Sequence, residues 1–178
     1  MTLPERVNYF DKITHGVFDE MGVTEVLIDM GYFTAPASTC FHENYEGGLF
    51  EHSLKVAKEL LHLTDALGLE WDRGDNQMAP MIVGLFHDLC KCDGYMIGKD
   101  GVIARNPEQM LPGHGEKSLY LARDQIALTE EEAMCIRYHM GAFTDQSEWK
   151  YYTRAVRKYP NVLWTHTADM LATHGKDR

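Results

Sequence analysis

The sequence has no long hydrophobic run, because an acidic, basic or histidine residue interrupts every apolar stretch. A membrane-spanning helix needs roughly 18 or more consecutive apolar residues, so the sequence predicts no transmembrane segment. The first residues, MTLPERVNYFDK, include acids and contain no apolar h-region of the kind that a secretion signal requires. We therefore expect a cytoplasmic protein with no membrane partner.

Cysteine is scarce, with 4 in 178 residues. This is too few for a disulfide scaffold, and we expect reduced thiols. Cys90 and Cys92 form a C-x-C pair, but no second pair completes a cysteine-rich zinc site. Internal repeats, low-complexity segments and linkers rich in Pro, Ser or Gly are also missing. At this length the sequence predicts one domain that spans residues 1–178.

Basic residues are outnumbered: 17 Lys and Arg stand against 27 Asp and Glu, which gives a formal net charge of −10. Binding to nucleic acid through bulk charge needs clustered Lys and Arg, so the composition argues against it. A small anionic substrate stays possible, since a bound divalent metal can reverse the local field in a pocket. Residues 150–158 depart from the acidic balance with four cations and no acid. They could clamp a phosphate or form a solvated helix face.

Helical periodicity dominates the chain. Residues 95–103 interrupt it with a glycine-bearing turn, which predicts a small β-hairpin. Thr129 and Glu132 have the spacing of a capping box. The prediction is an all-α bundle of about seven helices, with N-terminal helices over 1–33 and a helical core over 47–173. The expected helices cover residues 4–30 (one or two helices), 49–67, 79–89, 114–126, 129–140, 148–158 and 161–173.

Several of the nine histidines lie inside apolar, helix-like stretches. His52 lies on an apolar helix face, where an unpaired imidazole is costly, although a satisfied core histidine is a common alternative. Asp169 lies within WTHTADMLA, where a buried carboxylate needs a cation or a salt bridge. Two other histidines stand at predicted helix ends, where a bundle can direct them at a shared centre. The candidate metal ligands are His52, His87, Asp88, His114, His139 and Asp169.

Four imidazoles and two carboxylates favour Mn²⁺, Fe²⁺, Co²⁺, Ni²⁺ or Zn²⁺ over Ca²⁺. The set contains no cysteine, which argues against a closed structural zinc site. Six protein ligands are more than one catalytic metal binds when it also keeps a coordination position for water. The count therefore favours two divalent metals about 3.5–4 Å apart, with Asp88 as the bridge between them. A single metal held by fewer of these residues is the alternative.

The order H…HD…H…H…D over residues 52–169 resembles that of the HD-domain metal-dependent phosphohydrolases. Four segments carry the resemblance: GGLFEHSLKVAKEL, VGLFHDLCK, GHGEKS and WTHTADMLA. It implies a helical-bundle fold, and the additional histidines of dinuclear members match His114 and His139. Tyr138 precedes His139, where many dinuclear relatives carry a second histidine. The ligands of mononuclear members match His52, His87, Asp88 and Asp169.

The implied reaction is hydrolysis of a phosphate ester or anhydride, in a nucleotide or another small phosphate compound, by metal-activated water. Asp88 would orient that water and accept its proton, and Lys91 would reach a substrate phosphate or else be a solvated lysine. We expect specificity to lie in residues 34–48, 92–112 and 142–153. The residues expected to contact substrate are His42, Asn44, Lys117, His166 and Arg154.

Other functions fit parts of the sequence. The segment FHENYEGGLFEH also resembles the HD domains of bacterial 3′–5′ exoribonucleases, which suggests a phosphodiesterase or 3′–5′ nuclease acting on short nucleic acid. A binding module that holds metal without catalysis is a second alternative. A third is a di-iron oxygenase, because some HD relatives cleave C–C or C–P bonds.

Overall fold

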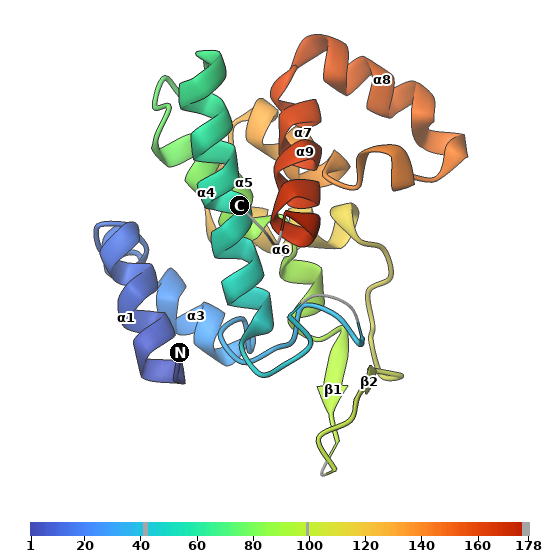
Figure 1. The fold of residues 1–178 in the computed structure, drawn as a ribbon. Helices are drawn as coiled ribbons and strands as arrows, with labels where there is room; N and C mark the ends of the chain where they lie inside the picture. The colour runs from blue at the N-terminus through green and yellow to red at the C-terminus, as the bar shows by residue number, and fades with distance from the viewer. Residues whose placement is uncertain (41–42, 99, 176–178) are drawn as a thin grey trace. The chain divides into compact units, whose positions relative to one another are not determined.

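A computed structural model describes residues 1–40, 43–98 and 100–175. These residues form nine α-helices, three short 3₁₀ helices and one two-stranded sheet (Figure 1), which confirms the predicted all-α fold with a small hairpin. The chain divides into two compact units. The first contains residues 1–52 and 89–112, and the second contains residues 53–88 and 113–178. The single domain over 1–178, with its 47–173 core, stays a prediction.

The N-terminal stretch of the first unit holds three helices where one or two were expected: α1 (Leu3–Ile13), α2 (Val17–Glu20) and α3 (Val23–Asp29). The breaks fall at Gly16 and Gly22, whose φ angles of 72° and 74° lie in the left-handed region. Glycine enters this region without steric cost, so the chain turns there although the apolar spacing continues. These breaks account for the higher helix count.

The hairpin of the first unit follows the sequence prediction, whereas the helix expected over 79–89 ends at Phe86 and a short 3₁₀ helix follows. The 3₁₀ helix η1 (Leu89–Lys91) leads into strand β1 (Tyr95–Ile97), which pairs antiparallel with β2 (Ile103–Arg105). An aromatic cluster forms the core, with ring centroids 5.1–6.4 Å apart and mostly edge-to-face. Its members are Phe10, Phe18, Tyr32, Phe33 and Phe50.

Arg6 joins α1 to the loop that follows α3. Its side chain is buried and donates hydrogen bonds to the carbonyl of Phe33 (3.0 Å) and to that of Glu46 (2.7 Å). Its Nε also donates to the carboxylate of Glu51 (3.5 Å). Gly47, with φ 81°, lies so close to the guanidinium that a Cβ there would overlap it. One buried side chain therefore holds three segments of the unit together.

We expect Arg6→Met to lower the free energy of unfolding by about 1–3 kcal/mol, because it leaves two backbone carbonyls without their donors. Urea denaturation measures the change. Arg105→Met is the matched control, since Arg105 is exposed on β2, and it should shift stability by no more than about 0.5 kcal/mol. Equal effects of the two substitutions would show that Arg6 does not brace the fold.

The second unit is a helical bundle. Helix α4 (Gly48–Leu67) begins in the first unit and continues here, and α5 (Met78–Phe86), α6 (Gly115–Gln125), α7 (Glu130–Tyr138), α8 (Trp149–Lys158) and α9 (Asn161–His174) follow. Helix α7 is central, since α5, α6, α8 and α9 all pack against it. The 3₁₀ helices η2 (Gly141–Phe143) and η3 (Gln146–Glu148) link α7 to α8. Among the described residues, every helix is too short or too polar to span a lipid bilayer.

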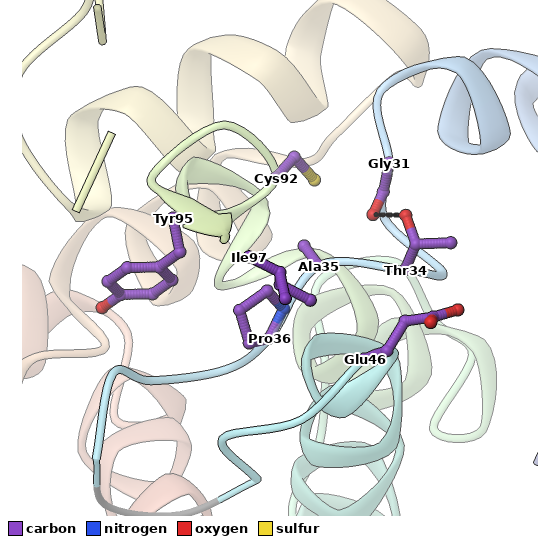
Figure 2. A pocket seen from close by; sticks show the side chains of 8 residues that line it. All are labelled: Gly31, Thr34, Ala35, Pro36, Glu46, Cys92, Tyr95 and Ile97. Atoms are coloured by element: carbon purple, nitrogen blue, oxygen red, sulfur yellow. Dashed lines mark hydrogen bonds between the residues drawn. The ribbon is translucent and has the colours of Figure 1, made fainter. Parts of the chain in front are cut away.

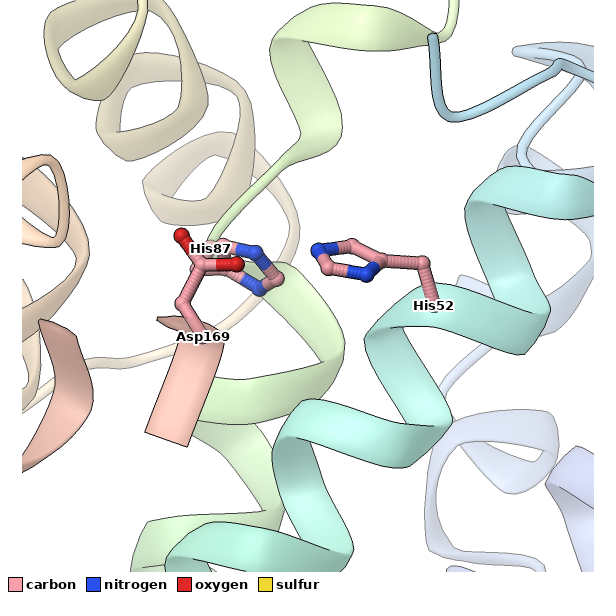
Figure 3. Close-up of side chains that lie close together, drawn as sticks. All are labelled: His52, His87 and Asp169. Carbon is pink, nitrogen blue, oxygen red and sulfur yellow. The ribbon is translucent and has the colours of Figure 1, made fainter. Parts of the chain in front are cut away.

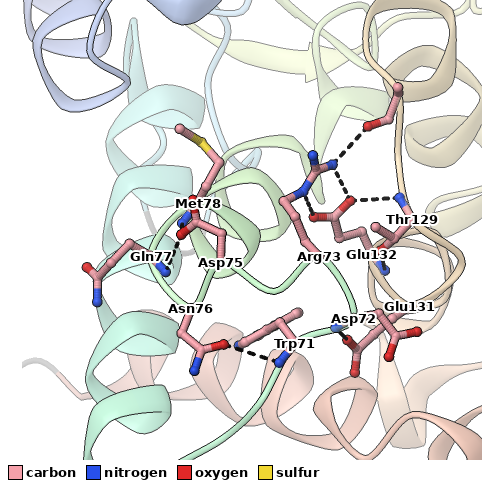
Figure 4. Close-up of polar contacts among 11 residues, drawn as sticks. Trp71, Asp72, Arg73, Asp75, Asn76, Gln77, Met78, Thr129, Glu131 and Glu132 are labelled. Carbon is pink, nitrogen blue, oxygen red and sulfur yellow. Dashed lines mark hydrogen bonds and ion pairs between the residues drawn. The ribbon is translucent and has the colours of Figure 1, made fainter.

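Polar contacts fix the N-terminal end of α7 (Figure 4). The predicted capping box between Thr129 and Glu132 is confirmed. Arg73, in the loop between α4 and α5, binds both carboxylate oxygens of Glu132, at 2.5 and 2.7 Å. Glu131 accepts from the backbone N–H of Asp72 (2.8 Å) and from Asn161 of α9 (3.0 Å). The helix is therefore anchored at one end, and its other end leads into His139.

Candidate metal centre

His87 and Asp88 stand where a buried helix ends. Residues 82–86 of α5 are buried, and His87 is its C-cap, after which η1 begins. Neighbouring residues within a helix point about 100° apart, so a shared site requires the helix to end or bend between them. The structure supplies that end. Both side chains are buried, with relative exposures of 0% and 3%.

Backbone carbonyls orient two of the histidine rings. Nδ1 of His87 lies 2.8 Å from the carbonyl of Gly84, and Nδ1 of His139 lies 2.8 Å from that of Ile136. Since a carbonyl only accepts, each Nδ1 donates to it, and Nε2 is the ring nitrogen left to face other partners. Metal-binding histidines are typically held by such a bond on the second ring nitrogen. Both Nε2 atoms are therefore available as ligands.

The carboxylate of Asp88 lies among three imidazoles. Its Oδ2 is 3.3 Å from Nε2 of His87. Its Oδ1 is 3.5 Å from Nε2 of His139 and 3.7 Å from Nδ1 of His114. One oxygen thus faces one histidine while the other faces two. The bridging role predicted for Asp88 stays a prediction.

Three overlapping groups contain ligand atoms that all lie within 4.8 Å of one another. His52, which belongs to one of them, is the last residue of the first unit, and its helix α4 continues into the second unit. Figure 3 shows His52, His87 and Asp169 directed toward one another. The groups are His52–His87–Asp169, His87–Asp88–His139 and Asp88–Cys90–His114.

The charge around His87 fits a bound cation. Burial by itself would lower the pKa of this imidazole, but the charge and hydrogen bond of Asp88, together with the charge of Asp169, outweigh burial and raise the pKa. The surroundings therefore stabilise positive charge on the buried ring. Imidazole nitrogen and carboxylate oxygen are donors that suit divalent transition metals. The residues present fit such an ion.

All six predicted ligands fall in these three groups. The sequence analysis overlooked two neighbours of the site. Cys90, treated above as an ordinary thiol, groups with Asp88 and His114, and it stands only two residues after Asp88. Glu43, which is buried and has a positive φ of 42°, places its carboxylate 3.8 Å from Nδ1 of His52.

The predicted substrate-binding residues that the structure describes differ in exposure and contacts. His42 lies outside the described residues, and Asn44 beside it is exposed. Lys117, like the predicted catalytic Lys91, is buried. His166 lies 2.9 Å from the carbonyl of His139 through its Nδ1, so it braces the turn that carries a candidate ligand. Arg154 is exposed on α8. Their roles toward substrate stay predictions.

Two of the three segments expected to set specificity meet in the first unit. Residues 34–46 and 92–97 contribute to a hollow of about 370 Å³, with a carboxylate, a thiol and a phenol on its walls (Figure 2). It is lined by Gly31, Thr34, Ala35, Pro36, Glu46, Cys92, Tyr95 and Ile97.

The third segment lines a hollow of about 240 Å³ in the second unit, together with the candidate ligand His114. Arg137 also lines it and forms ion pairs with Glu116 and Glu148, which hold the guanidinium in place. The exposed ring of Phe143 borders the same space. Through His114, this hollow adjoins the candidate ligand Asp88 of the same unit.

One curated protein shares sequence with part of the chain. Dihydroneopterin 2′,3′-cyclic phosphate phosphodiesterase of Methanocaldococcus jannaschii is 37% identical over 67 residues. The matched segment covers 38% of this chain and 27% of that protein, so the chain spans well under a third of its relative's length. No protein-family model matches the chain, and no solved structure matches it. Membership of the HD superfamily therefore stays a prediction.

Proposed function

We propose that the chain is an HD-type metal-dependent phosphohydrolase that cleaves a phosphate ester or anhydride of a small phosphate compound. One observation carries the proposal: the Asp88 carboxylate directs one oxygen at His87 and the other at His139 and His114. The partial similarity to a cyclic phosphate phosphodiesterase supports phosphoester hydrolysis as the reaction.

The ligand groups correspond to two metal positions that share Asp88. A divalent metal supplies a Lewis acid and a water of lowered pKa, which is what phosphoester hydrolysis at neutral pH requires. His52, His87, Asp88 and Asp169 would hold the first metal, and Asp88, His114 and His139 would hold the second.

The chain's own residues then orient the reactants. The Nδ1–H groups of His87 and His139 stay bonded to backbone carbonyls, so the rings keep their orientation during turnover. Asp88 positions the attacking water and accepts its proton on a carboxylate oxygen. Arg137, held by two carboxylates in the hollow beside His114, would bind the phosphate. Lys91, three residues after Asp88, would add a second positive charge.

Metal removal tests this function. Untagged protein should contain about two transition metals per chain and should release phosphate or open a cyclic phosphate in a screen of nucleotides, 2′,3′-cyclic phosphates and other small phosphates. A chelator should abolish turnover, and Mn²⁺, Co²⁺ or Ni²⁺ should restore it. Elemental analysis and phosphate release provide the measurements.

The outcomes separate the alternatives. One metal per chain would contradict the two-metal centre, and His114 and His139 would then have roles other than binding a second metal. Bound metal without turnover of any substrate would favour the binding module. Iron together with oxygen consumption would favour the oxygenase. Shortening of a labelled oligonucleotide from its 3′ end would favour the nuclease, whose substrate class gains support from the basic helix α8.

A further inference from the structure

Helix α8 is basic in an acidic chain. Its ten residues contain four cations and no acid. At 100° per residue, these cations fall within about 100° of the helix circumference. Lys158 pairs with Glu130 at 2.9 Å, but within the part of the chain that the structure describes the other three have no carboxylate partner. The three are Lys150, Arg154 and Arg157.

A hollow of about 240 Å³ lies between this helix and α7, inside the second unit. Every fourth residue of α7 faces it, and tyrosine rings form much of the remaining wall. Its one acid, Glu130, is already bound to Lys158. The lining comprises Glu130, Met134, Tyr138, Tyr151, Arg154, Ala155, Lys158 and Tyr159.

Cations and aromatic rings lie next to each other here. Lys150 Nζ lies 4.7 Å from the ring centre of Tyr151, and Arg154 Cζ lies 5.9 Å from the same centre. Tyr151 is 46% exposed, so its ring is accessible to a ligand. An aromatic ring beside cations is the chemistry with which proteins hold a nucleobase and its phosphate. The space is smaller than the roughly 300–1,000 Å³ of pockets for whole drug-sized ligands, so it suits one base.

We propose that the hollow between α7 and α8 binds a nucleotide, with the base against Tyr151 and the phosphate on Arg154 and Lys150. The site is separate from the metal centre, because α7 turns residues 130, 134 and 138 to this hollow, whereas His139, beyond its C-terminal end, faces Asp88. It needs no metal and involves no bond cleavage. The proposal of nucleotide binding at α8 is therefore independent of the proposed hydrolase activity.

Titration of the full chain with adenosine 5′-monophosphate tests the inference. Calorimetry at low salt should detect binding, which Arg154→Glu and Tyr151→Ala should each weaken at least about tenfold. Arg123→Glu makes the same charge change at an exposed position on α6 and should leave the affinity unchanged. Adenosine without its phosphate should bind more weakly, and added salt should weaken binding of the nucleotide.

A further variant separates this site from the metal centre. Asp88→Asn should leave nucleotide binding at the hollow unchanged, since Asp88 is not among its lining residues. Loss of binding in Asp88→Asn, with normal binding in Arg154→Glu, would place the nucleotide at the metal centre and overturn the proposal. Equal affinities of Arg154→Glu and Arg123→Glu would overturn it as well. Circular dichroism checks that each variant is folded.

Discussion

Asp88→Asn should lower kcat/KM for the best substrate by at least about 10³-fold, equivalent to about 4 kcal/mol of transition-state stabilisation. The substitution keeps the shape of the side chain but removes its charge and replaces one ligand oxygen with an NH₂ group. Both oxygens of Asp88 face imidazole nitrogens, at 3.3 to 3.7 Å. Whichever oxygen is lost, one side of the proposed two-metal arrangement would lose its shared ligand.

Metal content distinguishes a role of Asp88 as a metal ligand from a purely structural role. Asp88→Asn should bind fewer metals per chain than the unaltered protein while its circular dichroism stays the same. Asp65→Asn is the matched control, because Asp65 is exposed on α4 and its substitution should change neither metal content nor rate. If Asp88→Asn kept its metals and more than a tenth of the activity, Asp88 would not be the bridging ligand.

Local sequence features predicted most of the fold. The helix expected over 49–67 is Gly48–Leu67, that expected over 114–126 is Gly115–Gln125, and that expected over 161–173 is Asn161–His174. Apolar spacing and capping residues act within a few positions, so they can be read from one segment. Over 4–30 the spacing underestimated the number of helices, because the apolar repeat runs on through Gly16, whose left-handed conformation separates α1 from α2.

The candidate ligands could be predicted for a similar reason. A histidine or aspartate in an apolar stretch stands out locally, and His87 and His139 are indeed buried. Cys90 and Glu43 gave no such indication, since a buried cysteine is ordinary and a loop glutamate is usually solvated. Cys90 stands two residues after Asp88, but its grouping with His114, like the proximity of Glu43 to His52, arises from tertiary folding. The bond between Arg73 and Glu132, 59 residues apart, escaped prediction in the same way.

Gly84→Ala should lower the free energy of unfolding by about 3 kcal/mol, although alanine is the better helix former. A Cβ on Gly84 would overlap the backbone of Ala57, so α5 and α4 meet here backbone to backbone. No rotamer change relieves such an overlap, and one helix must shift. The carbonyl of Gly84 also accepts from Nδ1 of His87, so the shift would move a candidate ligand.

The sign of the change in unfolding free energy distinguishes a backbone contact at Gly84 from free space there. In a helix with free space at this position, glycine to alanine would raise stability by up to about 1 kcal/mol. Gly94→Ala is the control, since the nearest atom to its Cβ would be 3.3 Å away and a small adjustment accommodates it. Urea denaturation measures both variants. If Gly84→Ala were as stable as Gly94→Ala, the helices would not be in backbone contact. If Gly84→Ala were destabilised but kept its full metal content, α5 would have shifted without displacing His87. The Gly84 carbonyl would then not be needed to orient that ring.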